Sequence, residues 1–121
     1  MSYMLLIIEP PGQRATRTEA EGREAYALMR RFGEGLAAQG KLQAMESLSS
    51  HAGAVRISHA GGQAKVMDGP FSEAKEMIGG FFLLQNVTRE EAIALAHDCP
   101  AAQWCTVEVR ALAPCFDDSQ A

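Results

Sequence analysis

The chain has 121 residues, of which 47% are apolar and 21% are charged. These proportions are ordinary for a globular domain and exclude wholesale disorder, a collagen-like chain and a coiled coil. The 15 Asp and Glu residues outnumber the 11 Lys and Arg residues, and nine of the acidic side chains but only three of the basic ones lie in residues 67–121. An acidic second half argues against nucleic acid as a partner, because binding to nucleic acid depends on neutralising phosphates.

The N-terminal apolar run, residues 4–8, is too short to span a bilayer and has no basic flank of the kind that precedes a signal sequence. We therefore expect a cytoplasmic protein that does not interact with a membrane. The length predicts a single domain over residues 1–121, with a frayed tail at 114–121. The three cysteines have no CxxC spacing, so the sequence indicates neither a disulfide framework nor a zinc site.

The first third of the chain predicts a strand followed by a helix. Residues 3–8 are apolar and rich in β-forming side chains, and Pro10 ends the run. Thr18 and Glu21 have the spacing of a capping box, in which each side chain satisfies a free backbone N–H group of the other residue. Apolar residues then recur at helical spacing, which predicts an amphipathic helix over residues 19–39.

The middle of the chain predicts three short strands joined by turns. Residues 42–48 and 54–58 have the composition of strands, and the second of them alternates between apolar and polar side chains. A glycine pair at 61–62 predicts a hairpin turn into a further strand at 64–67. Residues 68–71, Asp-Gly-Pro-Phe, have the chemistry of another turn.

The last third predicts a strand, a helix and a final strand. Residues 80–87 are apolar and aromatic, as expected for a buried strand. Thr88 and Glu91 form a second capping box, which opens a helix that must end before Pro100. Residues 106–112 alternate as the last strand.

The resulting order, β-α-β-β-β-β-α-β, predicts an α+β fold of the ferredoxin-like, split βαβ type with an extra β-hairpin. Two helices cover only one face of such a sheet. The strand around residues 81–84 is apolar on both faces, so the second face is expected to meet another copy of the chain. We therefore predict a homodimer with the sheets face to face.

The connection between residues 68 and 80 is the segment most suggestive of a ligand site, because it is long and rich in charge. Asp68 is a candidate catalytic base or substrate anchor, and equally a residue that holds the turn before Gly69 and Pro70. Glu73, Lys75 and Glu76 could position a polar ligand, or could form a solvated surface cluster of little energetic consequence.

This segment resembles the DGPF-motif branch of the YCII-related family. The resemblance rests on Asp68 to Phe71 with Glu73, Lys75, Glu76, Gly79 and Gly80, on the ending Val107 to Arg110, and on the start Met4 to Ile8. It implies a ferredoxin-like fold assembled as a dimeric α+β barrel. One relative in the wider family removes chloride from a chlorinated hydroxyhydroquinone, and DGPF proteins often accompany extracytoplasmic-function sigma factors.

The wider family's proposed site pairs a histidine on the first helix with an aspartate. This sequence has no histidine between Thr18 and Gln39, where Tyr26 and Arg30 are the nearest polar candidates. One hypothesis is therefore a small-molecule enzyme using acid–base or elimination chemistry, with Asp68 as catalytic residue and Tyr26 assisting, in a cleft between the first helix and the 68–76 loop.

A second hypothesis is a non-catalytic ligand-binding or regulatory protein that works with a sigma factor. A third is a dimeric scaffold in which the Asp-Gly-Pro-Phe segment only builds the fold. The candidate ligand-binding residues are Gly69, Pro70, Phe71, Glu73, Lys75, Glu76 and Arg30. Because the histidines are scattered and no phosphate-binding loop is present, we predict no cofactor and no metal ion.

Overall fold

The computed structural model describes residues 2–117, and the predicted frayed tail lies outside the described residues from position 118 onward. The strands are β1 (Tyr3–Glu9), β2 (Leu42–Ser47), β3 (Val55–Ala60), β4 (Gln63–Asp68), β5 (Met77–Leu84) and β6 (Thr106–Ala111). The helices are α1 (Glu19–Ala38) and α2 (Arg89–Asp98), with short 3-10 helices η1 (Arg14–Thr16), η2 (His51–Gly53) and η3 (Pro100–Gln103). The predicted element order is confirmed.

Both helices begin at the predicted capping boxes. The Glu21 backbone N–H donates to the Thr18 hydroxyl, and the Thr18 N–H donates to the Glu21 carboxylate at 2.8 Å. Thr88 and Glu91 repeat the arrangement at the start of α2. These hydrogen bonds to the ionised form hold the pKa of both glutamates below its usual value.

Four strands form an antiparallel sheet in the order β2-β5-β1-β6. With the β3–β4 hairpin set aside, this α+β arrangement is compatible with a ferredoxin-like fold. The strand predicted at 80–87 begins earlier and ends earlier, at Met77 and Leu84. The reason is its pairing with β1, which extends to Glu9↔Met77 and so draws three residues of the predicted loop into the sheet.

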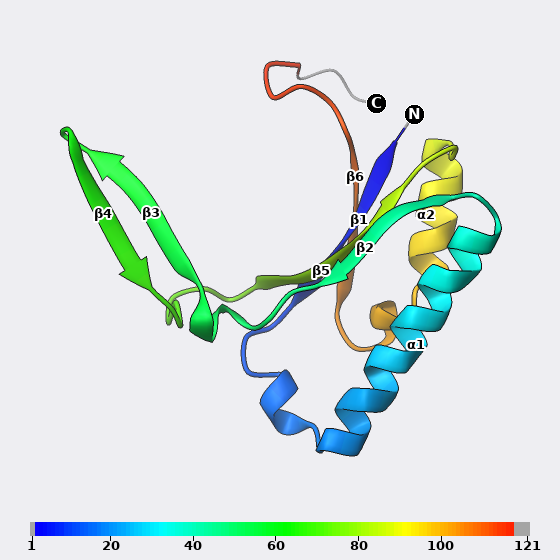
Figure 1. Ribbon diagram of the computed structural model, residues 1–121, viewed down its shortest axis with the longest axis horizontal. Coiled ribbons are helices and arrows are strands. Elements are labelled where there is room, and N and C mark those ends of the chain that lie inside the picture. Colours follow the sequence, from blue (N-terminus) through cyan, green and yellow to red (C-terminus); the bar gives the residue numbers. More distant parts are fainter. Residues whose placement is uncertain (1, 118–121) are drawn as a thin grey trace.

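Both helices pack on one face of this sheet (Figure 1). Alternate residues of β1, namely Tyr3, Leu5 and Ile7, point towards the helices and are buried. They form one core with the buried side chains of β5, α1 and α2, among them Phe82, Leu84, Leu36, Ala92 and Ala96. The alternation leaves the remaining β1 side chains on the opposite face, which no helix covers.

Helix α1 packs tightly only in its C-terminal half, where its two buried residues, Gly33 and Leu36, are found. A Cβ atom at Gly33 would overlap the sulfur of Met45 on β2. The neighbouring Phe32 meets Phe82 edge-to-face, with ring centroids 5.2 Å apart. The N-terminal half of α1 has no buried residue and stands away from the sheet.

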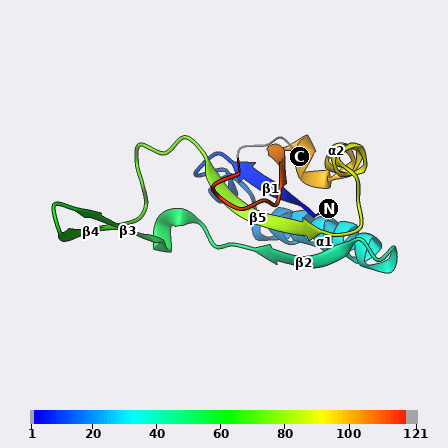
Figure 2. The ribbon, with the colours of Figure 1, turned by 90° about the horizontal axis from the view of Figure 1, so that it is seen from above.

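Strands β3 and β4 form a separate two-stranded sheet that projects from the body as an arm (Figures 1 and 2). We call residues 55–68 the arm. Its turn contains Gly61 and Gly62, both with positive φ, as a tight hairpin turn requires. Within residues 2–117 no helix is long and apolar enough to cross a membrane.

Candidate functional site

A cleft of about 650 Å³ lies between the N-terminal half of α1 and the four-stranded sheet. Its size falls within the range of about 300–1,000 Å³ that is usual for small-molecule sites. Its floor is apolar and its rim is charged. Its apolar lining includes Ile7, Met29, Met45, Phe82 and Trp104.

The cleft opens where α1 leaves the sheet, and the small residues Gly22 and Ala25 are among the α1 residues that line it. Gly22, Tyr26, Met29 and Arg30 follow the helical repeat along the face that looks into the cleft. A Cβ atom at Gly22 would meet nothing within 4 Å, in contrast to one at Gly33, about three turns later on the same helix. The open volume therefore begins where tight packing ends.

The charges around the cleft do not cancel. Four arginines and three glutamates line it. Arg14 pairs with Glu9, and Arg23 pairs with Glu19, one turn away on α1. The third glutamate, Glu46, follows Met45 on β2, so strand alternation directs its side chain to the opposite face of the sheet.

Two of the cleft arginines have no ion-pair partner among the described residues. Within residues 2–117, neither Arg17 nor Arg30 forms an ion pair with an acidic side chain. The Arg17 guanidinium lies 5.6 Å from the centre of the Trp104 ring, close enough for a cation–π interaction. A guanidinium that is not held in an ion pair and lies beside an aromatic ring is suited to holding an organic anion.

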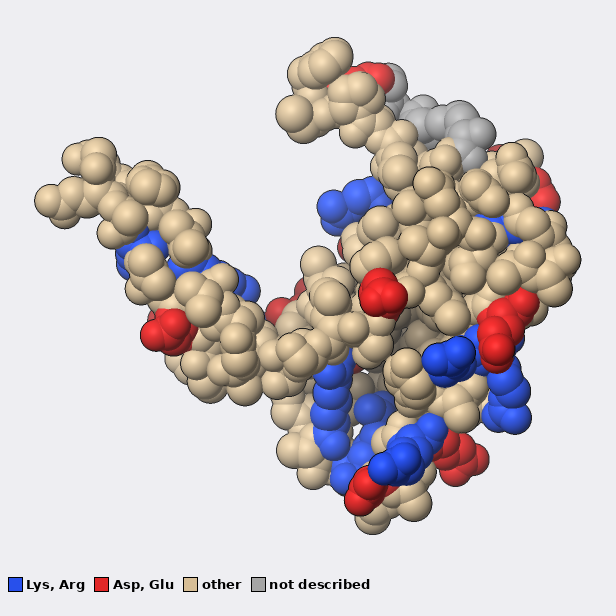
Figure 3. Space-filling view, viewed as in Figure 1, with Lys and Arg blue, Asp and Glu red and all other residues tan. Residues whose placement is uncertain are grey.

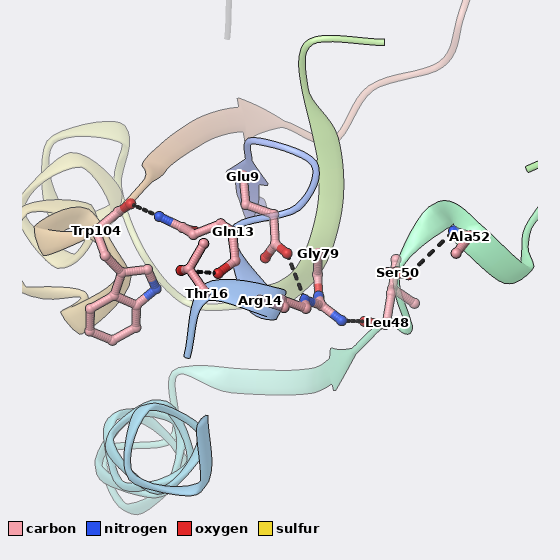
Figure 4. A network of polar contacts seen from close by, with 9 residues as sticks. All are labelled: Glu9, Gln13, Arg14, Thr16, Leu48, Ser50, Ala52, Gly79 and Trp104. Atoms are coloured by element: carbon pink, nitrogen blue, oxygen red, sulfur yellow. Dashed lines mark hydrogen bonds and ion pairs between the residues drawn. The ribbon is translucent and has the colours of Figure 1, made fainter. Parts of the chain in front are cut away.

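The Glu9–Arg14 pair fixes the end of the cleft nearest the arm (Figure 4). Glu9 is the buried charged residue at the end of β1, and its carboxylate accepts a hydrogen bond of 2.6 Å from Arg14 Nε. The same guanidinium donates to the carbonyls of Leu48 and Gly79, at 2.7 and 3.2 Å. One side chain thus joins β1 to the two chain segments that lead out to the arm.

Trp104 is held in place from the opposite side. The side-chain amide of Gln13 donates to the Trp104 backbone carbonyl at 2.6 Å, which ties the loop before η1 to the end of η3 (Figure 4). The indole is partly exposed and forms part of the cleft wall. Because Trp104 is the chain's single tryptophan, its fluorescence reports on the cleft alone.

Cys99 and Cys105 are not reactive nucleophiles at neutral pH. Burial raises the pKa of the Cys105 thiol to about 11, and the negative charge of Glu9 adds to the shift. Burial also raises the pKa of Cys99. Both thiols are therefore protonated at pH 7, whereas the thiolate is the nucleophilic form.

The structure separates the residues that the sequence singled out. Tyr26 and Arg30 line the cleft, one helical turn apart. Asp68 lies at the end of β4, on the arm, and none of residues 68–76 lines the cleft. The predicted cleft between the first helix and the 68–76 loop is therefore not formed within one chain.

The Asp-Gly-Pro-Phe segment forms the root of the arm. The Gly69 N–H donates to the Ala54 carbonyl at 2.7 Å, and a Cβ atom at Gly69 would overlap the His51 carbonyl oxygen. Phe71 is buried, and its N–H donates to Nδ1 of His51 at 3.4 Å. The Arg56 guanidinium covers the Phe71 ring at 3.8 Å.

The Asp68 side chain makes no hydrogen bond or ion pair with any residue between 2 and 117. In the expected turn, the Asp68 carboxylate would accept a hydrogen bond from the backbone N–H two residues later. That residue is Pro70, which has no N–H, so this hydrogen bond cannot form. Phe71, the next residue, donates its N–H to His51 instead. Glu73, Lys75 and Glu76 are exposed on the loop that follows.

Sequence reasoning missed Glu9, Arg14 and Arg17. One signal was present: Glu9 ends a strand in which Tyr3, Leu5 and Ile7 face the core, so the alternation places its carboxylate on the buried face. A buried carboxylate needs a cationic partner. Which arginine supplies it cannot be read from spacing.

Within residues 2–117, no group of three or more His, Cys, Asp or Glu side chains is arranged to hold a metal ion. The cleft offers donors instead: the Arg17 and Arg30 guanidinium groups and the Tyr26 hydroxyl. These groups can bind and orient an anion.

Comparison with known proteins identifies the family. The YCII-related domain matches residues 1–115. An uncharacterised protein of Rhizobium meliloti is 37% identical over 93 residues, which cover 75% of this chain and 72% of that protein. The residues matched by the family include those of both the cleft and the arm. On these grounds, the chain belongs to the YCII-related domain family.

Proposed function

We propose that the chain binds a small organic anion in the cleft under α1. The observation that carries this proposal is the pair of arginines without acidic partners, Arg17 and Arg30, above an apolar and aromatic floor. A guanidinium group can donate two parallel hydrogen bonds to a carboxylate. The floor, with Trp104 at one side, would accept the hydrocarbon part of the same molecule.

This proposal favours ligand binding over acid–base catalysis as the role of the cleft. The carboxylate that faces the cleft from β1, Glu9, is already engaged with Arg14 at 2.6 Å. Tyr26, which is half exposed, could donate a hydrogen bond to the ligand. The cleft therefore contains hydrogen-bond donors for an anion. A free catalytic base facing the cleft would have to be supplied by another residue.

Acid–base or elimination chemistry at Asp68 stays a prediction. The exposure of Asp68 and its lack of a partner within residues 2–117 leave its carboxylate free to act on a molecule bound outside this chain's own cleft. Membership of the DGPF-motif branch, a cytoplasmic location and an association with a sigma factor are likewise predictions from the sequence.

We also propose that the chain forms a homodimer through the face of the sheet opposite the helices. Met4, Leu6 and Ile8 of β1 and Phe81 and Leu83 of β5 are apolar and only partly buried on that face. A surface of this kind usually marks an interface. It supports the expected dimer with the sheets face to face.

Fluorescence of Trp104 provides the test of anion binding. Titration with phenylacetate and with phenylacetamide compares two molecules of similar size that differ in charge. We expect phenylacetate to change the emission and to bind about tenfold more tightly, a difference of about 1.4 kcal/mol. Replacing Arg30→Gln should reduce the preference.

Arg31→Gln is the matched control, because Arg31 lies on the same helix, is exposed and does not line the cleft. It should keep the preference for the carboxylate. Equal binding of the two probes by the wild type, or equal loss in the Arg30 and Arg31 variants, would contradict the proposal.

A further inference from the structure

The two cleft arginines that form no ion pair within residues 2–117 lie far apart along α1. Arg17 comes shortly before Glu19, the first residue of the helix. Arg30 lies about three helical turns after Glu19, which corresponds to about 16 Å along the helix axis. The α1 residues that line the cleft span the same three turns, so the cleft is elongated along the helix.

Each arginine has donor groups to offer to a ligand. Within the described part of the chain, neither guanidinium donates a hydrogen bond, whereas those of Arg14 and Arg23 do. Arg17 lies 5.6 Å from the centre of the Trp104 ring at one end of the cleft. Long side chains of a helix lie over the preceding turn, so the Arg30 guanidinium is expected beside Tyr26 at the other end.

The stretch between the two arginines is apolar or internally neutralised. Gly22, Ala25 and Met29 lie between them on α1 and line the cleft. Figure 3 shows charged side chains of both signs around η1 and along α1. Two of those that line the cleft, Arg23 and Glu19, pair with each other at 2.8 Å. The cleft therefore offers a cation at each end and apolar side chains between them.

We propose that the ligand of the cleft is an elongated dianion, with an acidic group at each end and an apolar middle, as in a long-chain dicarboxylate. The inference rests on the proposed anion binding and goes beyond it, because that proposal needs only one acidic group. A carboxylate fits the fork of one guanidinium at a time. Two arginines separated by three helical turns therefore call for two acidic groups.

A single molecule satisfies both ends better than two separate anions. Once one carboxylate is bound, the other is held near the second arginine, so the second contact forms within the complex. The connecting hydrocarbon would cover Ala25 and Met29 and be removed from water, which is favourable. A polar chain in the same place would exchange hydrogen bonds with water for contacts with apolar side chains, at a cost.

The test is isothermal titration calorimetry of the full chain with two matched pairs of acids. Suberate and octanoate have the same chain length and differ in the second carboxylate, and succinate and butyrate form the corresponding short pair. We expect suberate to bind at least about tenfold more tightly than octanoate, because each of its ends meets an arginine. Succinate should gain over butyrate only the statistical advantage of two identical ends, because it is too short to reach both arginines.

Substitution of either arginine should remove the bridging. In Arg17→Gln and in Arg30→Gln, the gain of suberate over octanoate should fall to the statistical value. Arg31→Gln is the control and should keep the gain, since Arg31 is exposed on the same helix and does not line the cleft. Far-UV circular dichroism checks that each variant is folded. A gain that persists in either of the first two variants would overturn the proposal.

The outcomes separate this inference from the proposed anion binding. If octanoate binds more tightly than octanamide but suberate gains nothing over octanoate, the cleft holds one acidic group and the dianion is excluded. An equal gain in the long and the short pair would also exclude bridging, because the second charge would then act without reaching the second arginine. If no carboxylate binds more tightly than octanamide, the proposed function fails as well.

Discussion

The cleft under α1 and the segment 68–76 contrast in how they are built. The cleft draws its residues from stretches far apart in the sequence, and most of its side chains are individually ordinary. The segment is contiguous and rich in turn and charged residues, yet it lines no part of the cleft. Its most constrained members, Gly69 and Phe71, hold the root of the arm.

This difference shows that a distinctive local motif can be required by the fold. Gly69 is required by a close backbone approach to His51, and Phe71 is required to fill the root. The cleft demands less of any single position, since an open volume needs only small or flexible side chains at the right places. The two regions should therefore respond differently to substitution.

The largest effect is expected at the root. Gly69→Ala brings a Cβ atom into the His51 carbonyl, and relief requires backbone movement, at a cost of about 3 kcal/mol. We expect lower thermal stability, with binding of phenylacetate retained. Gly53→Ala, whose Cβ would meet nothing within 4 Å, should change neither. Loss of binding in Gly69→Ala would show that the two regions are not separate.

Glu9→Gln should weaken both regions, because the Glu9–Arg14 pair lies between them. The substitution leaves the partly buried Arg14 guanidinium without its anion, and we expect a loss of about 2 kcal/mol in the free energy of unfolding. Urea denaturation measures it. Hydrogen exchange should also become faster at the amides of Leu48 and Gly79. An unchanged free energy of unfolding would contradict this prediction, because it would mean that water compensates fully for the lost Glu9–Arg14 ion pair.

Gly22→Leu should affect the cleft and spare the arm. The leucine side chain would enter the open volume, and we expect phenylacetate binding to weaken by about tenfold, or about 1.4 kcal/mol. Gly35→Leu is the control, since Gly35 lies exposed on the same helix. Both variants replace a helical glycine and should gain up to about 1 kcal/mol in stability. Similar binding by both variants would argue against this cleft as the site.

The smallest effect is expected at Asp68. Its exposed side chain has no partner within residues 2–117, so Asp68→Asn should change the free energy of unfolding by less than about 0.5 kcal/mol. Thermal unfolding at a concentration where the wild type is dimeric measures it. A loss of several degrees would restore the interpretation of Asp68 as a turn-holding residue.

Local patterns predicted the elements well. The capping residues Thr18 and Thr88 mark the helix starts, and the predicted helix 19–39 ends one residue earlier, at Ala38. These features depend on neighbours within one turn, so the sequence carries them directly. The start of β5 was misplaced because its pairing with β1, and not its own composition, decides where the strand begins.

The cleft could be predicted only in part. Tyr26 and Arg30 were identified because they are polar residues on the first helix, and both line it. Trp104 and Arg17 are brought together by the packing of η3 near the start of α1, which no local pattern encodes. The exposure of the arm also depends on the tertiary arrangement. The alternation of apolar and polar residues in the arm predicts only an ordinary half-buried hairpin.

Quenching of Trp104 fluorescence by iodide and by caesium tests the central claim most directly, because it needs no knowledge of the ligand. A cleft with two unpaired arginines should admit the anion and repel the cation, so iodide should quench more strongly at low salt. The difference should shrink as salt screens the charges, and in Arg30→Gln but not in Arg31→Gln. Equal quenching by the two ions in the wild type, or a preference that Arg30→Gln leaves unchanged, would contradict the assignment of this cleft as an anion site.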